Sequence, residues 1–259
     1  MWQQGGDIYT QLMGRWSRSL SPLLIDFAGI DDGDRVLDVG CGTGSLSLAL
    51  LEHGPNVRVA GIDASGPYVQ FAQQQIASPR AALEQGDAQF LSFADDTFDK
   101  SVSLLVLNFV PDPGKAVGEM RRVTRPGGRI AAGVWDYGDG MEMLRILWDT
   151  AVELDTAAEA KHERHMPLCR EGELGELWTQ NGLRDVDQTP LTIQLDFESF
   201  DDYWAPFLTG AGPSGSYVSS LDDDLRSELM DRLLQRLCGG EPDQPFHLSA
   251  RAWAVRGSI

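Results

Sequence analysis

The stretch RVLDVGCGTG, residues 35–44, decides the fold of this chain. Its first half is a run of strand-forming residues, its second half is rich in glycine, and an apolar helical segment follows over residues 46–51. Glycine lets a backbone turn sharply and approach a ligand closely, and the first turn of a helix carries free N–H groups. The stretch therefore predicts a strand, a tight turn and a helix, with a ligand beside the turn.

The alternation of strand and helix continues on the C-terminal side of this unit. Further strands are predicted over residues 57–62, 81–85, 100–107 and 129–135, and helices over residues 67–76 and 115–123. Ser65 precedes the first of these helices as an N-cap. Alternation over roughly 100 residues implies right-handed βαβ units, which form a parallel sheet with helices on both faces.

The pattern changes after residue 135. Helices are predicted over residues 141–160 and 173–180, and strands over residues 186–195 and 247–255. Between these two strands we expect two helices and a bend rich in Gly, Pro and Ser over residues 210–216. The simplest interpretation is one α/β domain with a mostly helical cap, inserted after the fifth and sixth strands.

Two carboxylates stand at the ends of the strands that follow the glycine turn. Asp63 lies 19 residues after Gly44, where a carboxylate can accept hydrogen bonds from both hydroxyls of a ribose. Asp87, within Gly-Asp-Ala at residues 86–88, stands beside a hydrophobic slot suited to an adenine ring. Open α/β sheets bind ligands at the carboxyl ends of their strands. A nucleoside-containing ligand is therefore expected.

The glycine turn does not match the fingerprints of two common nucleotide folds. In the two possible registers of G-x-G-x-x-G/A, Ser45 or Ser47 occupies the third position. No Gly-Lys-Ser/Thr follows, so the turn is not a P-loop. An NAD(P)-dependent oxidoreductase therefore remains only as an alternative.

Taken together, these motifs resemble those of the class I S-adenosylmethionine-dependent methyltransferases, and most closely their small-molecule branch of ubiquinone- and menaquinone-type enzymes. The resemblance rests on residues 36–44, Asp63, residues 86–88 and Arg-Pro-Gly-Gly at residues 125–128. It implies a doubly wound seven-stranded α/β sheet, mostly parallel with an antiparallel last strand, and a helical cap. It also implies S-adenosyl-L-methionine as the cofactor and S-adenosyl-L-homocysteine as the product.

The resemblance also assigns cofactor contacts. Asp38 and the glycine turn would face the methionine moiety, Asp63 the ribose and Asp87 the adenine. Tyr9 or Arg15 would meet the carboxylate of the cofactor. The complete predicted set is Tyr9, Arg15, Asp38, Gly40, Cys41, Gly42, Thr43, Gly44, Asp63, Ala64, Gly86, Asp87, Ala88 and Asn108. Two alternatives stay open: Asp38 could instead support the loop backbone, and Arg15 could form a surface ion pair.

Aromatic residues are concentrated over residues 197–217. Their spacing fits a helix docked on the core, but they could also form a lid that holds a flat or apolar acceptor and excludes water. The lid would consist of Phe200, Tyr203, Trp204, Phe207 and Tyr217, with Gly210, Gly212 and Gly215 as hinges. Candidates for a catalytic base are His162, His165 and Tyr203, although the two histidines could equally lie at a solvated helix end.

The amino-acid composition excludes several classes of binding partner. The 21 Lys and Arg against 39 Asp and Glu give a net charge of −18, whereas nucleic-acid binders need a local basic excess, so no nucleic-acid partner is expected. Three distant cysteines and no ligand-like His/Cys/Asp spacing predict neither a disulfide framework nor a metal site. Without signal-peptide features or a membrane-spanning apolar run, a cytoplasmic monomer or homodimer is expected.

The sequence thus predicts a methyltransferase that moves a methyl group from S-adenosylmethionine to a small-molecule acceptor by in-line displacement. A binding protein with the same cofactor loop but no activity is the other alternative. Residues 1–259 would form a single domain. Within it, we expect an N-terminal helical cover over 1–34, a cofactor-binding half over 35–135, and cap insertions over 136–170 and 196–243.

Overall fold

β1 (Arg35–Val39) lies at the centre of the sheet because most of its residues can be buried on both faces. The computed structural model, which describes residues 13–259, pairs it in parallel with β2 (Arg58–Asp63) and β4 (Phe98–Leu104). β3 (Ala81–Gln85) extends the parallel sheet beyond β2. The ranges predicted for the first and third strands are confirmed.

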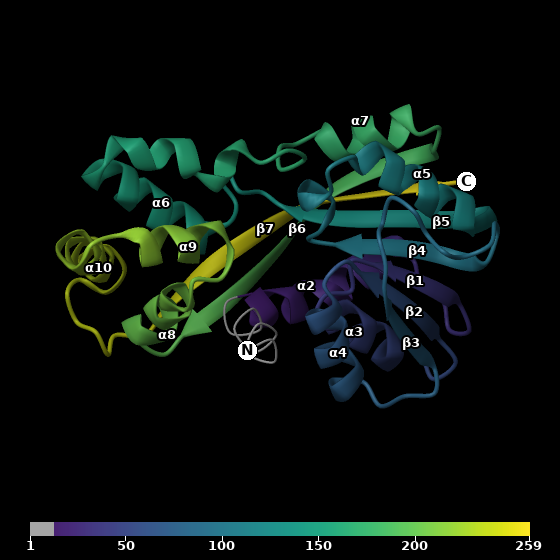
Figure 1. Cartoon of the computed structure of the whole chain (residues 1–259), viewed down its shortest axis with the longest axis horizontal. Helices are drawn as coiled ribbons and strands as arrows, with labels where there is room; N and C mark the ends of the chain where they lie inside the picture. The colour runs from purple at the N-terminus through teal and green to yellow at the C-terminus, as the bar shows by residue number, and fades with distance from the viewer. Residues whose placement is uncertain (1–12) are drawn as a thin grey trace.

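The other half of the sheet contains the longest strands. β5 (Thr124–Trp135) is parallel to β4, whereas β7 (Phe246–Ser258) runs antiparallel to both β5 and β6 (Arg184–Phe197). The seven strands follow the order β3-β2-β1-β4-β5-β7-β6, which confirms the predicted mostly parallel sheet with an antiparallel last strand. β6 and β7 are longer than predicted and extend beyond the sheet into the cap (Figure 1).

Helices cover both faces of the sheet (Figure 1). On one face lie α2 (Arg15–Ala28), α3 (Ser45–His53) and α4 (Gly66–Gln75), and the Ser65 hydroxyl caps α4 by accepting from the Tyr68 N–H. On the other face lie α5 (Pro113–Val123) and α7 (Glu173–Gln180). None of the helices within residues 13–259 is both long enough and apolar enough to cross a membrane.

The cap contains one group of helices after β5 and another after β6. The first group is α6 (Glu142–Leu154), η3 (Thr156–Lys161) and η4 (Glu163–His165). The second group is α8 (Phe200–Trp204), η5 (Ala205–Thr209), α9 (Gly212–Ser220) and α10 (Asp223–Cys238). α10 packs against α6 and α8, and α9 packs against α6, so the two groups form one layer.

Several predicted boundaries are wrong, among them the start of β5, which is Thr124 and not residue 129. The helix predicted over 141–160 ends at Leu154, because Asp155 is extended and its carboxylate accepts from the Ala157 N–H to start a separate turn. The strand predicted over 100–107 ends at Leu104, because Leu105 has a φ of 64°. The bend predicted over 210–216 is instead largely the start of α9, so two of the three proposed hinge glycines are helical.

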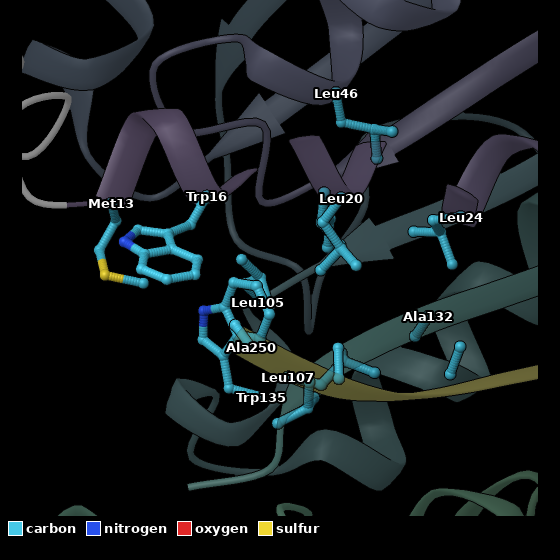
Figure 2. Close-up of a cluster of buried hydrophobic side chains, with 14 of the residues drawn as sticks. Met13, Trp16, Leu20, Leu24, Leu46, Leu105, Leu107, Ala132, Trp135 and Ala250 are labelled. Atoms are coloured by element: carbon cyan, nitrogen blue, oxygen red, sulfur yellow. The ribbon is translucent and has the colours of Figure 1, made fainter. Parts of the chain in front are cut away.

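A hydrophobic cluster joins α2 to the sheet and the cap. Figure 2 shows Met13, Trp16, Leu20 and Leu24 along the start of the described chain, with Trp16 facing Trp135 of β5 and Leu24 above Ala132. Trp16 is fully buried, and its ring lies edge-on to Trp135 with 6.5 Å between the centroids. Burying each large apolar side chain contributes roughly 1.5–3 kcal/mol, so this cluster fixes α2 against the sheet.

Candidate functional site

Three positions of the turn after β1 favour glycine by their backbone conformation. Gly40, Gly42 and Gly44 have φ values of 78°, 52° and 91°, which side-chain-bearing residues rarely adopt. A Cβ on Gly40 would stand 2.4 Å from the methyl carbons of Val106, and one on Gly44 would stand 2.7 Å from Cδ1 of Ile76. The backbone therefore passes close to the segment that follows β4 and to the end of α4, and the start of α3 faces the turn.

Asp63, at the end of β2, holds this turn in place. Its Oδ2 accepts from the Gly42 N–H at 2.9 Å and its Oδ1 accepts from the Ser65 N–H at 2.8 Å. Burial raises the pKa of the carboxyl despite these two hydrogen bonds. A partly buried carboxylate with remaining lone pairs can still accept from ligand hydroxyls.

Asp38, on β1, is the buried acid of the site. Its Oδ2 accepts from the Ser47 hydroxyl at 2.6 Å, whereas its Oδ1 is buried with no hydrogen-bond partner in the described part of the chain. Burial, reinforced by the charge of Asp63, raises the pKa of Asp38 to about 7 against the opposing effect of the Ser47 hydrogen bond. An orphaned buried acceptor is costly unless a ligand supplies a donor, and a cationic amine would satisfy it best.

A cavity of about 490 Å³ opens beside these groups at the carboxyl ends of the strands, within the size range of small-molecule sites. The structure brings most of the predicted cofactor residues into its wall. These are Asp38, Gly40, Cys41, Gly42, Thr43, Asp63, Ala64, Gly86, Asp87 and Ala88. Gly44 shapes the turn from outside the wall.

The remaining predicted cofactor residues are not in this wall. Arg15 binds Asp202 at 2.9 and 3.0 Å and stacks on Phe197, so it takes the ion-pair role that the sequence left open. Asn108 is buried and donates from Nδ2 to the sulfur of Met166. Tyr9 lies outside the described residues.

Other residues of the wall were missed from sequence. The most informative is Tyr68, in the first turn of α4, whose pKa is raised by burial and by the charge of Asp63. Its position could have been inferred, because the first turn of a helix after a strand faces the ligand edge of the sheet. Ser17 and Gln89 also line the wall and carried no such signal.

The predicted lid residues lie in the packed interior of the cap. Phe200, Tyr203, Trp204, Phe207 and Tyr217 are all buried, and none of them lines the 490 Å³ cavity. The Tyr203 hydroxyl donates to the backbone oxygen of Met143 at 3.0 Å, and burial raises its pKa further. This environment is that of a core tyrosine and opposes a role as a base.

Neither predicted histidine reaches the cavity. His162 is buried against Trp148, its Nδ1 accepts from the Arg164 N–H at 3.0 Å, and burial lowers its pKa to about 4. His165 lies at the surface beside Glu159, with 2.9 Å between its Nε2 and a carboxylate oxygen. His162 is thus part of the cap core, and His165 matches the solvated position considered from sequence.

Comparison with known proteins agrees with this geometry. A family model described as a methyltransferase domain matches residues 30–181. An uncharacterised protein of Mycobacterium tuberculosis is 36% identical over 250 residues, which cover 93% of this chain and 88% of that protein. The demethylmenaquinone methyltransferase of Halalkalibacterium halodurans is 38% identical over 105 residues, 39% of this chain and 43% of that protein.

The fold has solved counterparts. Phosphoethanolamine N-methyltransferase 2 of Haemonchus contortus, solved with S-adenosyl-L-methionine, aligns with a TM-score of 0.62 at 15% identity. The alignment covers 99% of this chain and 57% of that one, and at this identity it supports the fold alone. With the family match, the strand order and the glycine-turn cavity, it follows that the chain belongs to the class I S-adenosylmethionine-dependent methyltransferases.

Proposed function

We propose that this protein transfers a methyl group from S-adenosyl-L-methionine to a small-molecule acceptor. The observation that carries the proposal is the cavity at the carboxyl ends of β1, β2 and β3, whose lining contains Asp38, Asp63 and Asp87. When bound, the cofactor supplies a methyl group already activated by its sulfonium charge. The protein then has to hold the acceptor in line with it and exclude water.

The residues of the wall suit this cofactor. The unpartnered Oδ1 of Asp38 would accept from the amino group of the methionine moiety, and Asp63 would accept from the ribose hydroxyls. Asp87 lies at the exposed end of the wall, where Gln89 lowers its pKa by backbone and side-chain hydrogen bonds. It would accept from the exocyclic amine of the adenine.

A small acceptor is favoured by the size of the cavity. Its volume of about 490 Å³ is within the range of small-molecule sites. The net charge of −18 opposes a nucleic-acid substrate. The demethylmenaquinone methyltransferase carries a small-molecule acceptor in its name, and this chain resembles it over 105 residues.

The cofactor assignment is tested by calorimetric titration with S-adenosylhomocysteine. Asp63→Ala should weaken binding by about tenfold or more, because ribose hydroxyls lose a charged acceptor and the Gly42 N–H loses its partner. Asp231→Ala, on α10 and outside the cavity, is the matched control and should bind like the wild type. If Asp63→Ala binds S-adenosylhomocysteine with unchanged affinity, the cofactor assignment is wrong. Tight binding of NADH in place of S-adenosylhomocysteine would favour the oxidoreductase alternative.

A further inference from the structure

A second, smaller cavity of about 60 Å³ adjoins the cofactor cavity on the side of the cap. The two cavities share Leu105 and Phe109, which follow β4, as lining residues. The second cavity is otherwise lined by Met13, Trp135, Tyr137, Leu144, Glu163, Gly212, Pro213 and Ser214. No Lys or Arg is present in this lining, so it does not suit a phosphate-bearing group.

Glu163 is the only acidic residue in this lining. Glu163 is only 5% exposed. Its Oε2 accepts from the indole N–H of Trp148 at 2.7 Å, and this is the only hydrogen bond of the carboxyl group in the described part of the chain. Trp148 is itself held between His162, with centroids 5.6 Å apart, and Tyr217, with centroids 5.0 Å apart. The carboxyl is therefore fixed in position by the cap core.

The electrostatics of Glu163 differ from those of a structural ion pair. Burial raises its pKa to about 7, and the Trp148 hydrogen bond opposes the shift only in part. The nearby titratable groups do not compensate its charge: His162 is held neutral by a pKa of about 4, Tyr217 has a raised pKa, and Arg164 is paired with Glu159. Tyr137 is the only other titratable side chain in the lining.

The backbone between the two cavities is strained. Leu105 has a φ of 64°, which is unusual for a bulky residue, and its N–H donates to the Gly133 oxygen at 2.7 Å. Strain of this kind costs about 1–3 kcal/mol and is retained where the surrounding structure requires it, often at functional sites. Here it turns the chain so that Leu105 forms part of both walls.

We infer that the second cavity receives the reacting end of the methyl acceptor, a hydroxyl group on an apolar body, and that Glu163 is the catalytic residue that removes the hydroxyl proton. This inference rests on the proposed methyltransferase function, because it places the acceptor next to the cofactor cavity. A carboxylate in a lining without any basic group binds an O–H donor strongly and selects against acceptors that lack one.

The chemistry balances without any further reactant. The acceptor oxygen forms a bond to the methyl carbon, the carbon–sulfur bond breaks with its electron pair going to sulfur, and the hydroxyl proton passes to the Glu163 carboxylate. The sulfonium charge is thereby neutralised, and the protonated Glu163 returns its proton to solvent when the product leaves. A base with a pKa near the working pH is suited to this transfer in both directions.

The test uses phenol and toluene, which share a ring and differ by the hydroxyl. Each is titrated by ligand-observed NMR into the full-length protein saturated with S-adenosylhomocysteine, at pH 5.5 and pH 8.5. At pH 8.5 the wild type should bind phenol about fivefold or more tightly than toluene, because ionised Glu163 accepts from the O–H. At pH 5.5, below the pKa of Glu163, this preference should fall severalfold.

Glu163→Gln separates this role from a structural one. Glutamine keeps the shape and can still accept from Trp148, so the phenol preference should become independent of pH. Glu171→Gln, exposed and outside the cavity, is the matched control and should behave like the wild type. A phenol preference that keeps its pH dependence in Glu163→Gln would overturn the inference. If this variant fails to fold, equal binding of phenol and toluene by the wild type at both pH values would overturn it instead.

The same titrations distinguish the two proposals. If S-adenosylhomocysteine does not bind the wild type, the proposed function fails, and the inference fails with it. If S-adenosylhomocysteine binds but phenol is not preferred over toluene, only the role of Glu163 is wrong and the methyltransferase proposal stands.

Discussion

Asp38 lowers the stability of the folded protein at neutral pH and is proposed to bind the cofactor. Its carboxyl is buried on β1 with one oxygen bonded to Ser47 and the other unpaired. Folding favours the protonated form, since the pKa rises from 3.8 to about 7. At neutral pH and above, the native state therefore either holds a proton that the unfolded chain would release or buries a charge. The remaining lone pairs are available to the proposed cofactor.

Asp38→Asn should therefore raise the free energy of unfolding at pH 8, by at most ~4 kcal/mol, because the cost of the buried charge is removed. The gain should shrink towards zero near pH 4, where wild-type Asp38 is protonated in the native state. Urea unfolding at the two pH values measures both. The same variant should bind S-adenosylhomocysteine about tenfold more weakly. A stabilisation equal at both pH values would contradict the assigned ionisation.

The candidate site also shows which residues sequence reasoning can reach. Asp63 stands at the end of a strand at a fixed spacing from a glycine turn, so its place follows from the topology of parallel sheets. Glu163 is not predicted as a site residue from the sequence, because it lies between His162 and His165 in a charged segment, and such segments are normally exposed to solvent. Only the tertiary contact with Trp148, brought from α6, makes it a buried acid. No local pattern carries that information.

At the scale of the elements, α2 contacts both the sheet and the cap. It packs on α3 and on the sheet, and the indole N–H of Trp16 donates to the sulfur of Met143 in the cap at 3.2 Å. Arg15, one residue earlier, binds Asp202 at the start of α8. A single helix thus connects the cofactor-binding half with both groups of cap helices, which explains why its buried face is so strongly apolar.

Trp16→Ala should lower the free energy of unfolding by ~3–5 kcal/mol, because it leaves a cavity between α2, β5 and the cap. Arg18→Ala, exposed on the same helix, is the control and should stay within about 0.5 kcal/mol of the wild type. Chemical denaturation monitored by circular dichroism gives both values. A loss below 1 kcal/mol in Trp16→Ala would mean that α2 does not join the two parts of the molecule.

The ends of helices and strands are predicted correctly where local sequence signals set them. The predictions are wrong where tertiary contacts set the ends. β1 and β3 have the predicted ranges because glycine, serine or proline punctuates both ends. β6 and β7 run further than predicted, because the two strands pair with each other along their whole length, from Arg184 and Ser258 to Phe197 and Phe246. The start of α9 is predicted as a bend because clustered Gly, Pro and Ser are typical of turns. The helix forms because the segment packs closely in the cap, where a Cβ on Gly215 would lie 3.0 Å from the backbone of Gly210.

At the scale of the whole molecule, the same two strands belong to both the sheet and the cap. β6 and β7 form one antiparallel ladder that begins beside β5 and ends at α8. Figure 1 shows this pair running from the sheet into the cap. The cap is therefore an outgrowth of the sheet and has no separate core boundary at which it could detach.

Unfolding should accordingly occur in a single transition. Tryptophan fluorescence, which reports on Trp148 and Trp204 in the cap and Trp178 against the sheet, should change at the same denaturant concentration as the far-ultraviolet circular dichroism. If the cap unfolds before the sheet, the two signals will have different midpoints. The β6–β7 ladder would then be too weak to couple the cap to the sheet.

The long β6–β7 ladder has a consequence for how an acceptor enters and leaves. Because the ladder prevents the cap from swinging as a rigid body, access must come from local opening of the short elements that border the second cavity, such as the first turn of α9. Backbone amides of the ladder should exchange with deuterium only through global unfolding, whereas those of residues 210–220 should exchange through fast local fluctuations. The slowest step of turnover would then be governed by these fluctuations and not by a domain closure.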